Sequence, residues 1–220
     1  AEPAGMEIWK STDIRTIVTQ KYDEEEDEEK NDLLVWHLDS DRIVRLVDDT
    51  LDDPRIVAGG KLVLATDDKP YEFDAMFGRG TVDIHAIDVD SGEHKIVAEN
   101  VRPRFGASTT GRYVHYFRDG GYYAYDLDED SPISLSNQVD SSLVRQEFDH
   151  PVSELPPWEV AGWTAEDKSL LVYDEFDVWE LPIEGLSRRL TEGRANEDIS
   201  RIVDLDEEQE IGRAARSERG

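Results

Sequence analysis

The chain has 220 residues, with 24 Lys and Arg against 52 Asp and Glu and a formal net charge of −28. This balance argues against a protein that binds nucleic acid or an anionic membrane surface, because both need clustered basic side chains. The lack of cysteine excludes disulfides, thiolate zinc sites and cysteine nucleophiles. The 5 Trp, 8 Tyr and 6 Phe residues nevertheless indicate a folded core.

The first 32 residues differ in pattern from the rest of the chain. They lack a basic stretch followed by an apolar one, so no signal peptide is expected in this sequence, and no segment approaches the roughly 20 apolar residues of a membrane helix. The short stretch Asp13–Val18 is followed by the acidic run Asp23–Glu29, whose like charges repel one another. We expect residues 1–32 to hold part of a sheet and an acidic insertion, either a frayed helix or a loop.

Four later segments repeat one pattern, in which alternate apolar residues lead into a turn of acidic residues or glycine. Strict alternation is typical of a half-buried strand, and such turns tolerate a tight backbone. Each segment is therefore predicted to form a β-hairpin. The segments are Leu33–Val47, Val82–Ala98, Gly121–Ser136 and Asp177–Thr191. Their alternating residues are Leu34, Trp36 and Leu38; His85, Ile87 and Val89; Tyr123, Tyr125 and Leu127; and Trp179, Leu181 and Ile183.

Three of the hairpins follow a further predicted strand, at residues 62–68, 113–117 and 170–176, so that each repeat is expected to contain three strands. The unequal spacing of the repeats suits propeller blades of about 40–50 residues with loop insertions. The sequence therefore predicts an all-β fold, a partial β-propeller of about three to four blades of antiparallel strands. We expect the blades at residues 33–203 and a polar tail at 204–220.

A long connection, Ser142–Trp163, interrupts the repeats. It contains Pro151, Pro156 and Pro157, and proline disfavours regular strand pairing. Within it, Asp149 and His150 stand side by side and could orient one another, although hydrogen bonding within a loop explains the pair equally well. His37, His85 and His115 lie in predicted strands and are expected to be structural.

No other pattern indicates catalysis or metal binding. Ser108 lies in the string GASTTG, which has neither the spacing nor the strand-to-helix setting of a serine nucleophile. Asp88–Glu93 is similar to part of a calcium loop, but a hairpin turn explains it without metal. Glu175 and Asp177 could serve as the carboxylate pair of a glycosidase, but acidic pairs arise by chance in so acidic a chain. No cofactor and no metal are expected.

Part of the chain resembles a known family. The string AGWTAEDK at Ala161–Lys168, followed by LLVYDEFDVWEL at Leu170–Leu181, resembles the N-terminal β-propeller of bacterial prolyl oligopeptidase family serine peptidases. Phe148–Pro151 and Glu154–Trp158 carry the same resemblance, and Thr109–Val114 is similar to a blade turn of those propellers and of TolB-type propellers. The acidic run Asp23–Glu29 departs from the family pattern.

The resemblance implies a function without catalytic residues in this chain. In that family the propeller stands beside an α/β-hydrolase domain with a Ser-His-Asp triad, and it shields the active site and filters peptide substrates. No residue here matches the triad. We therefore expect a non-catalytic segment of a serine peptidase (a hydrolase) that gates and positions peptides for a hydrolase domain of the same parent chain. The residues expected to face substrate are Asp149, His150 and Trp158.

Two alternatives stay open at this point. The chain could be a stand-alone TolB-type propeller that acts as a protein-interaction module, or a glycosidase that uses two carboxylates. The family weakly favours a periplasmic or secreted location, and the sequence leaves the compartment open. The acidic surface also suggests adaptation to high salt, because salt screens the self-repulsion of a highly charged chain.

Overall fold

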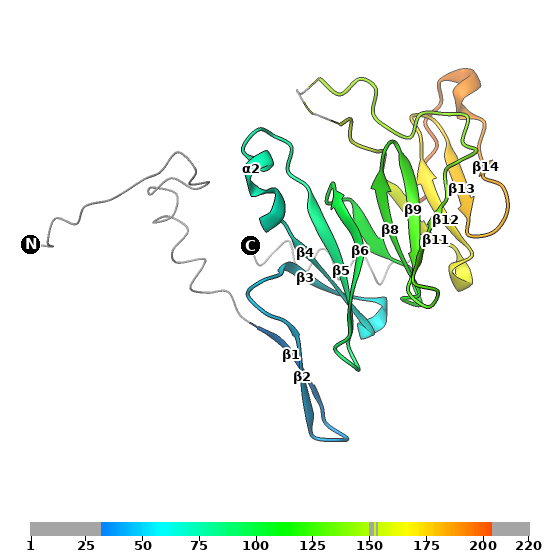
Figure 1. Cartoon of the computed structure of the whole chain (residues 1–220). Coiled ribbons are helices and arrows are strands. Elements are labelled where there is room, and N and C mark those ends of the chain that lie inside the picture. Colours follow the sequence, from blue (N-terminus) through cyan, green and yellow to red (C-terminus); the bar gives the residue numbers. More distant parts are fainter. Residues whose placement is uncertain (1–31, 150–151, 153, 204–220) are drawn as a thin grey trace, which may run out of the picture.

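The structure, a computed structural model, describes residues 32–149, 152 and 154–203 (Figure 1). The predicted acidic insertion before residue 32, the polar tail at 204–220, and His150 and Pro151 lie outside the described residues. Across the described ranges, no helix is both long and apolar enough to cross a membrane.

Four antiparallel sheets follow one another along the chain (Figure 1). Sheet 1 has two strands, and sheets 2 to 4 have four strands each. Within each sheet, strands that are consecutive in the chain are hydrogen-bonded neighbours. Sheet 1 contains β1 (Leu33–His37) and β2 (Arg42–Val47). Sheet 2 contains β3 (Asp52–Val57), β4 (Leu62–Asp67), β5 (Val82–Asp88) and β6 (His94–Val101). Sheet 3 contains β7 (Phe105–Ala107), β8 (Tyr113–Arg118), β9 (Gly121–Asp126) and β10 (Ser131–Ser134). Sheet 4 contains β11 (Val160–Trp163), β12 (Ser169–Tyr173), β13 (Val178–Pro182) and β14 (Arg188–Arg189).

This topology confirms the predicted fold class. Each larger sheet is one antiparallel meander, and successive meanders pack face to face, which is the arrangement of propeller blades. The chain therefore forms an all-β partial propeller with three four-stranded blades and the two-stranded sheet 1. All four predicted hairpins are present, as β1–β2, β5–β6, β9–β10 and β13–β14.

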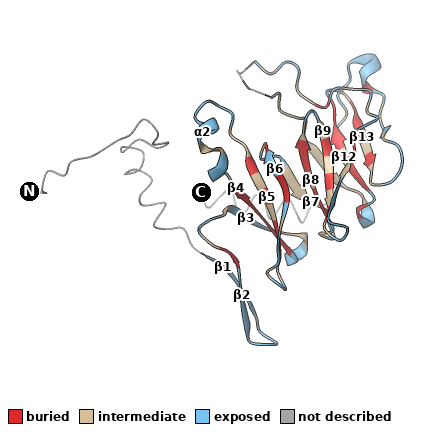
Figure 2. Cartoon of the chain, viewed as in Figure 1, coloured by how far each residue is buried: buried red, intermediate tan, exposed pale blue. Residues whose placement is uncertain are grey.

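Apolar side chains hold neighbouring sheets together, and the most buried strands lie inside the stack (Figure 2). One cluster, which includes Ile84 and Val114, joins sheets 2 and 3, and another, which includes Tyr122 and Leu181, joins sheets 3 and 4. A smaller cluster around Leu46 and Val63 joins sheets 1 and 2. Since burying one such aliphatic side chain contributes about 1.5–3 kcal/mol, these clusters are the main source of stability.

A sheet inside the stack buries both faces. Alternate residues of its strands therefore pack against two different neighbouring sheets and do not divide into a buried face and a solvent face. In β9, Tyr122 and Ala124 pack toward sheet 4, whereas Tyr123 and Tyr125 pack toward sheet 2. Sheet 1 differs because no described sheet covers its second face. There Leu34, Trp36 and Leu38 are 54%, 59% and 74% exposed, so the predicted half-buried face of this hairpin is wrong; the face that packs on sheet 2 carries Leu33 and Val35.

The expectation of three strands per blade is also wrong, because each blade begins with a further strand. These first strands are β3, β7 and β11. β3 contains Pro54 and an irregular register between Asp52 and Arg55, and β7 has three residues, so neither shows a clear alternation. β11 occupies the end of the proline-containing connection, where we expected no regular pairing, and Pro157 itself forms an isolated bridge with Val144.

Helical structure in the described residues is confined to single turns. The longest described loop within a blade, between β4 and β5, carries two of them. The turns are η1 (Ala58–Gly60), η2 (Lys69–Tyr71), α2 (Glu72–Ala75), η3 (Ala165–Asp167) and η4 (Gly193–Asn196).

Candidate functional site

The first strands of the three larger sheets meet at one cavity of about 550 Å³, which we call the hub cavity. Arg55 reaches it from β3, Phe105 from β7 and Val160 from β11, so each blade contributes to the wall. The cavity therefore marks where the edges of the blades converge. Its lining consists of Arg55, Pro103, Arg104, Phe105, His115, Tyr122, Arg145, Phe148, Pro156, Pro157, Trp158, Glu159 and Val160.

Aromatic side chains in this region are tied to guanidinium groups. The Arg55 guanidinium lies over the Phe105 ring at 5.4 Å, which links β3 to β7. Trp158 lies between two arginines, with the guanidinium of Arg145 at 5.0 Å from its ring and that of Arg201 at 5.5 Å. Cation–π contacts of this kind hold both groups in place while leaving guanidinium N–H groups free to donate.

Two of the polar side chains in the cavity wall, His115 and Tyr122, carry no charge at neutral pH. Desolvation lowers the pKa of the half-buried His115 to about 4, so the ring is uncharged at neutral pH. Trp163 Nε1 donates to His115 Nδ1 at 3.2 Å, which fixes the ring. The ring lies against Gly106, where an added Cβ would stand 2.7 Å from His115 Cε1, so this position of β7 requires glycine. Tyr122 Oη donates to the backbone carbonyl of Trp158 at 2.6 Å, and burial raises the pKa of that hydroxyl.

Of the three residues expected to face substrate, Trp158 lies at the hub cavity. Asp149 is exposed on the same connection and is not among the lining residues, and His150 lies outside the described residues. Two further hollows, of about 390 and 320 Å³, adjoin the connection, and Phe148 lines both of them as well as the hub cavity. The connection between sheets 3 and 4 therefore contributes residues to the walls of all three hollows.

The arginines of the hub cavity were not singled out from the sequence. They belong to no motif, and the chain contains many arginines elsewhere. One signal was available: Arg102-Pro103-Arg104 directly precedes the first strand of sheet 3, so two basic residues stand at the entrance to that blade in an acidic chain.

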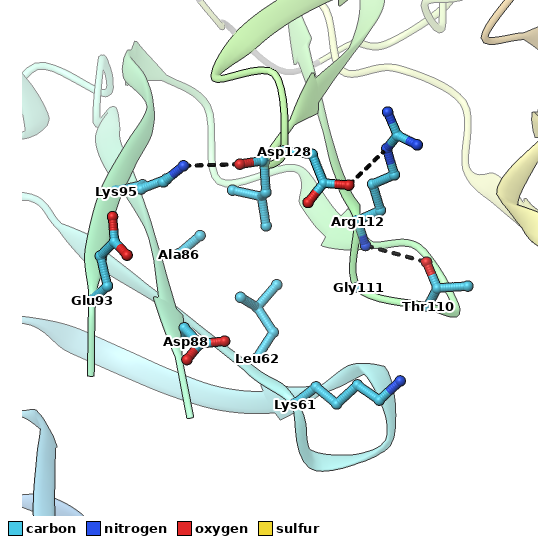
Figure 3. Close-up of a pocket in the computed structure, with 11 residues that line it drawn as sticks. Lys61, Leu62, Ala86, Asp88, Glu93, Lys95, Thr110, Gly111, Arg112 and Asp128 are labelled. Carbon is cyan, nitrogen blue, oxygen red and sulfur yellow. Dashed lines mark hydrogen bonds and ion pairs between the residues drawn. The ribbon is translucent and has the colours of Figure 1, made fainter. Parts of the chain in front are cut away.

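A separate hollow of about 480 Å³ lies between sheets 2 and 3, away from the first strands (Figure 3). Two of its basic side chains are engaged by groups of sheet 3. Arg112 contacts Asp126 at 2.7 Å and Asp128 at 3.3 Å, and Lys95 donates to the Leu127 carbonyl at 2.8 Å. Since Lys95 of β6 is bound by the carbonyl of Leu127 in sheet 3, these contacts help to join the two blades.

The remaining candidates from the sequence have structural partners. Ser108 is buried and its Oγ accepts from the Tyr113 N–H at 3.0 Å. Asp88 Oδ1 accepts from the N–H and hydroxyl of Ser91, both at 2.7 Å, as in a hairpin turn. Within the part of the chain that the structure describes, no group of three or more potential ligands is placed to hold a metal ion.

The glycosidase alternative does not fit the geometry. Asp177 is fully buried, and its carboxylate accepts from the hydroxyl of Thr191 at 2.8 Å and from the N–H of Gly193 at 2.5 Å. Glu175 is exposed on the adjacent turn. A buried carboxylate that is bound by the segment after β14 cannot approach a sugar, so this pair does not form a two-carboxylate catalytic site.

Comparison with known proteins adds similarities of fold. No family model and no curated protein matches the chain. Among solved structures, it is similar to TolB from Acinetobacter baumannii (13% identity, TM-score 0.42), over 73% of this chain and 37% of that one. It is also similar to the β-propeller domain of the Trilobed protease from Pyrococcus furiosus (15% identity, TM-score 0.41), over 74% of this chain and 50% of that one. A third similar structure is an acylaminoacyl peptidase from Pyrococcus horikoshii (13% identity, TM-score 0.42), over 76% of this chain and 29% of that one. The chain thus spans half or less of each of these structures.

Proposed function

We propose that this chain is a propeller segment of a prolyl-oligopeptidase-like serine peptidase, and that it gates and positions peptide substrates for an α/β-hydrolase domain of the same parent chain. The observation that carries the proposal is the hub cavity. It lies where all three four-stranded blades converge, and it combines aromatic rings with guanidinium groups, which suits a peptide better than a small apolar ligand.

The sequence resemblance supports the same role. The residues that carry it, at Glu154–Trp158 and Ala161–Lys168, lead into the cavity wall and then form β11 and the turn η3. Asp167 of that turn is buried, and it accepts from the N–H groups of Thr109 and Thr110 in sheet 3, both at 3.0 Å. The resembling segment therefore both shapes the cavity and joins two blades.

In this mechanism, the chain supplies binding and exclusion, and the hydrolase domain supplies acyl transfer by its triad. Phe105 and Trp158 place aromatic rings in the cavity wall with guanidinium groups over them, and the guanidinium and backbone donors of the wall fix the direction of a bound peptide. Blades that are stacked on both faces are rigid, so the width of the hub limits which peptides pass. Positioning of this kind lowers the entropic cost of the reaction that follows.

The first test is the coding sequence that follows Gly220 in the gene. A downstream hydrolase domain with a G-x-S-x-G nucleophile elbow is the expected result. A stop codon directly after this segment would overturn the peptidase proposal and favour a stand-alone TolB-type interaction module.

The second test addresses gating in the parent protein. Trp158→Ala removes a large ring from the cavity wall and keeps the backbone carbonyl that Tyr122 binds. We expect kcat/KM to rise for long peptides relative to a dipeptide p-nitroanilide. Trp36→Ala, on the exposed face of sheet 1, is the matched control and should leave that ratio unchanged. An unchanged ratio in Trp158→Ala would argue against gating by the hub.

A further inference from the structure

The charge of the hub cavity is opposite to that of the chain. The full sequence has 24 Lys and Arg against 52 Asp and Glu, yet the charged side chains that line the cavity at neutral pH are Arg55, Arg104, Arg145 and Glu159. A basic cavity within an acidic surface concentrates field lines on its opening and attracts anions there. The inversion therefore indicates a ligand with negative charge.

Two of the arginines retain donors for such a ligand. Across residues 32–149, 152 and 154–203, the Arg104 guanidinium forms no hydrogen bond or ion pair. Arg145 contacts Glu159 through one terminal nitrogen at 3.3 Å, and its Nε is buried without a hydrogen-bond partner in the same described part. Arg55 is engaged by Asp53 and serves mainly to hold Phe105. Because Arg145 Nε has no accessible surface, a ligand in the cavity would meet the terminal nitrogens of Arg145 and the exposed side chain of Arg104.

The setting favours a carboxylate. A guanidinium presents parallel N–H groups that match both oxygens of a carboxylate. Phe105 and Trp158 line the cavity beside these arginines, and the neutral His115 adds no competing charge. We infer that the hub cavity binds a carboxylate of a peptide through Arg104 and Arg145, with Glu159 displaced from Arg145 or sharing it. This inference rests on the proposed function for the peptide and names the group that the cavity recognises.

The peptide carboxylate has two sources, the C-terminus and the side chains of Asp and Glu. Four hexapeptides that share an acetylated N-terminus separate the two sources. They combine a C-terminal acid or a C-terminal amide with an internal Glu or an internal Gln, and are otherwise identical. Calorimetric titration of the full chain with each peptide, at one fixed ionic strength, measures the contribution of each carboxylate. The variants are Arg104→Gln and Arg145→Gln. The matched control is Arg188→Gln, an exposed arginine on β14, the last strand of sheet 4.

We expect at least one carboxylate-bearing peptide to bind roughly tenfold or more tightly than its neutral counterpart. Arg104→Gln and Arg145→Gln should reduce that preference to near unity, whereas Arg188→Gln should keep it. Circular dichroism of each variant shows whether the fold is intact. Equal binding of all four peptides, or an unchanged preference in both hub variants, would overturn the carboxylate site while leaving peptide binding by the propeller in place. Failure of every peptide to bind would overturn both.

Discussion

The buried carboxylate of Asp174 provides the sharpest test of how this blade stack is held together. It lies just after β12 and accepts hydrogen bonds from Ser141 Oγ at 2.6 Å, Trp179 Nε1 at 3.0 Å and Arg194 at 2.9 Å. The N–H groups of Phe176 and Asp177 donate to its other oxygen, at 2.9 and 2.6 Å. One side chain thus ties the connection before sheet 4 to the end of that sheet.

Asp174→Asn keeps the shape of the side chain and removes its charge. Whichever way the amide is turned, its NH2 faces at least two of these donors, and Arg194 loses its anionic partner. Each buried donor left without an acceptor costs about 1–3 kcal/mol, so the loss of at least two should cost about 3–5 kcal/mol, although Arg194 itself is 43% exposed. For a chain of this size, that loss corresponds to a fall in Tm of about 6–20 °C.

Urea and thermal unfolding at pH 7, followed by circular dichroism, measure the loss. Asp90→Asn is the matched control, because the Asp90 side chain is 90% exposed and the change should cost less than about 0.5 kcal/mol. A loss below about 1 kcal/mol in Asp174→Asn would refute the reasoning, because single charged hydrogen bonds already contribute about 1.5–3 kcal/mol.

The pH dependence checks the same carboxylate by an independent route. Burial favours the neutral acid, but the donors from Ser141, Asp177, Trp179 and Arg194 outweigh it and lower the pKa of Asp174 from 3.8 to about 2. The folded pKa is below the unfolded one, so the stabilisation is present above pH 3.8 and is lost as pH falls toward 2. The stability gap between the wild type and Asp174→Asn should therefore narrow over that window, and a gap that is constant with pH would contradict the assignment.

Three further predictions follow from other parts of the stack. Asp167→Ala removes the acceptor that joins sheet 4 to the turn of sheet 3 and should lower stability by about 1–3 kcal/mol in urea unfolding, with the m-value unchanged. Gly106→Ala should destabilise by about 1–3 kcal/mol in the same assay, because its Cβ meets the His115 ring, which is held by Trp163, and a neutral result would show that the ring can move. The Tm of the chain should rise between low and molar NaCl because salt screens a net charge of −28, and a flat or falling Tm would remove the idea of salt adaptation.

The hairpins could be predicted because local sequence decides them. Alternating apolar residues and acidic turns lie next to each other in the chain, so β5–β6 and β13–β14 are visible without knowledge of the neighbouring sheets. The face that each strand buries was harder to predict, because it depends on whether a second sheet covers it. Alternating apolar residues are buried in β13, at Trp179 and Leu181, whereas the corresponding residues of β1, Leu34 and Trp36, are exposed.

The first strands and the hub could not be predicted for a related reason. β7 has three residues and β11 follows a proline-containing connection, so their pairing depends on the strands beside them rather than on their own pattern. The cavity is built from the ends of these strands. Trp158 belongs to a segment that carries the family resemblance, whereas Arg104 and Arg145 belong to no motif and are brought to one wall only by the fold.

The acidic surface and the basic hub respond to salt differently, which allows their contributions to be separated. At about 1 M salt the Debye length is near 3 Å, so repulsion between exposed carboxylates is almost fully screened. A carboxylate bound by the hub arginines is in direct contact with guanidinium N–H groups, those of Arg145 beside the Trp158 ring, and salt screens a direct contact less than it screens long-range repulsion. Peptide affinity should therefore retain most of its carboxylate preference at salt concentrations that already stabilise the fold. A preference that vanished with the first increments of salt would place the recognition on the exposed surface instead of inside the hub.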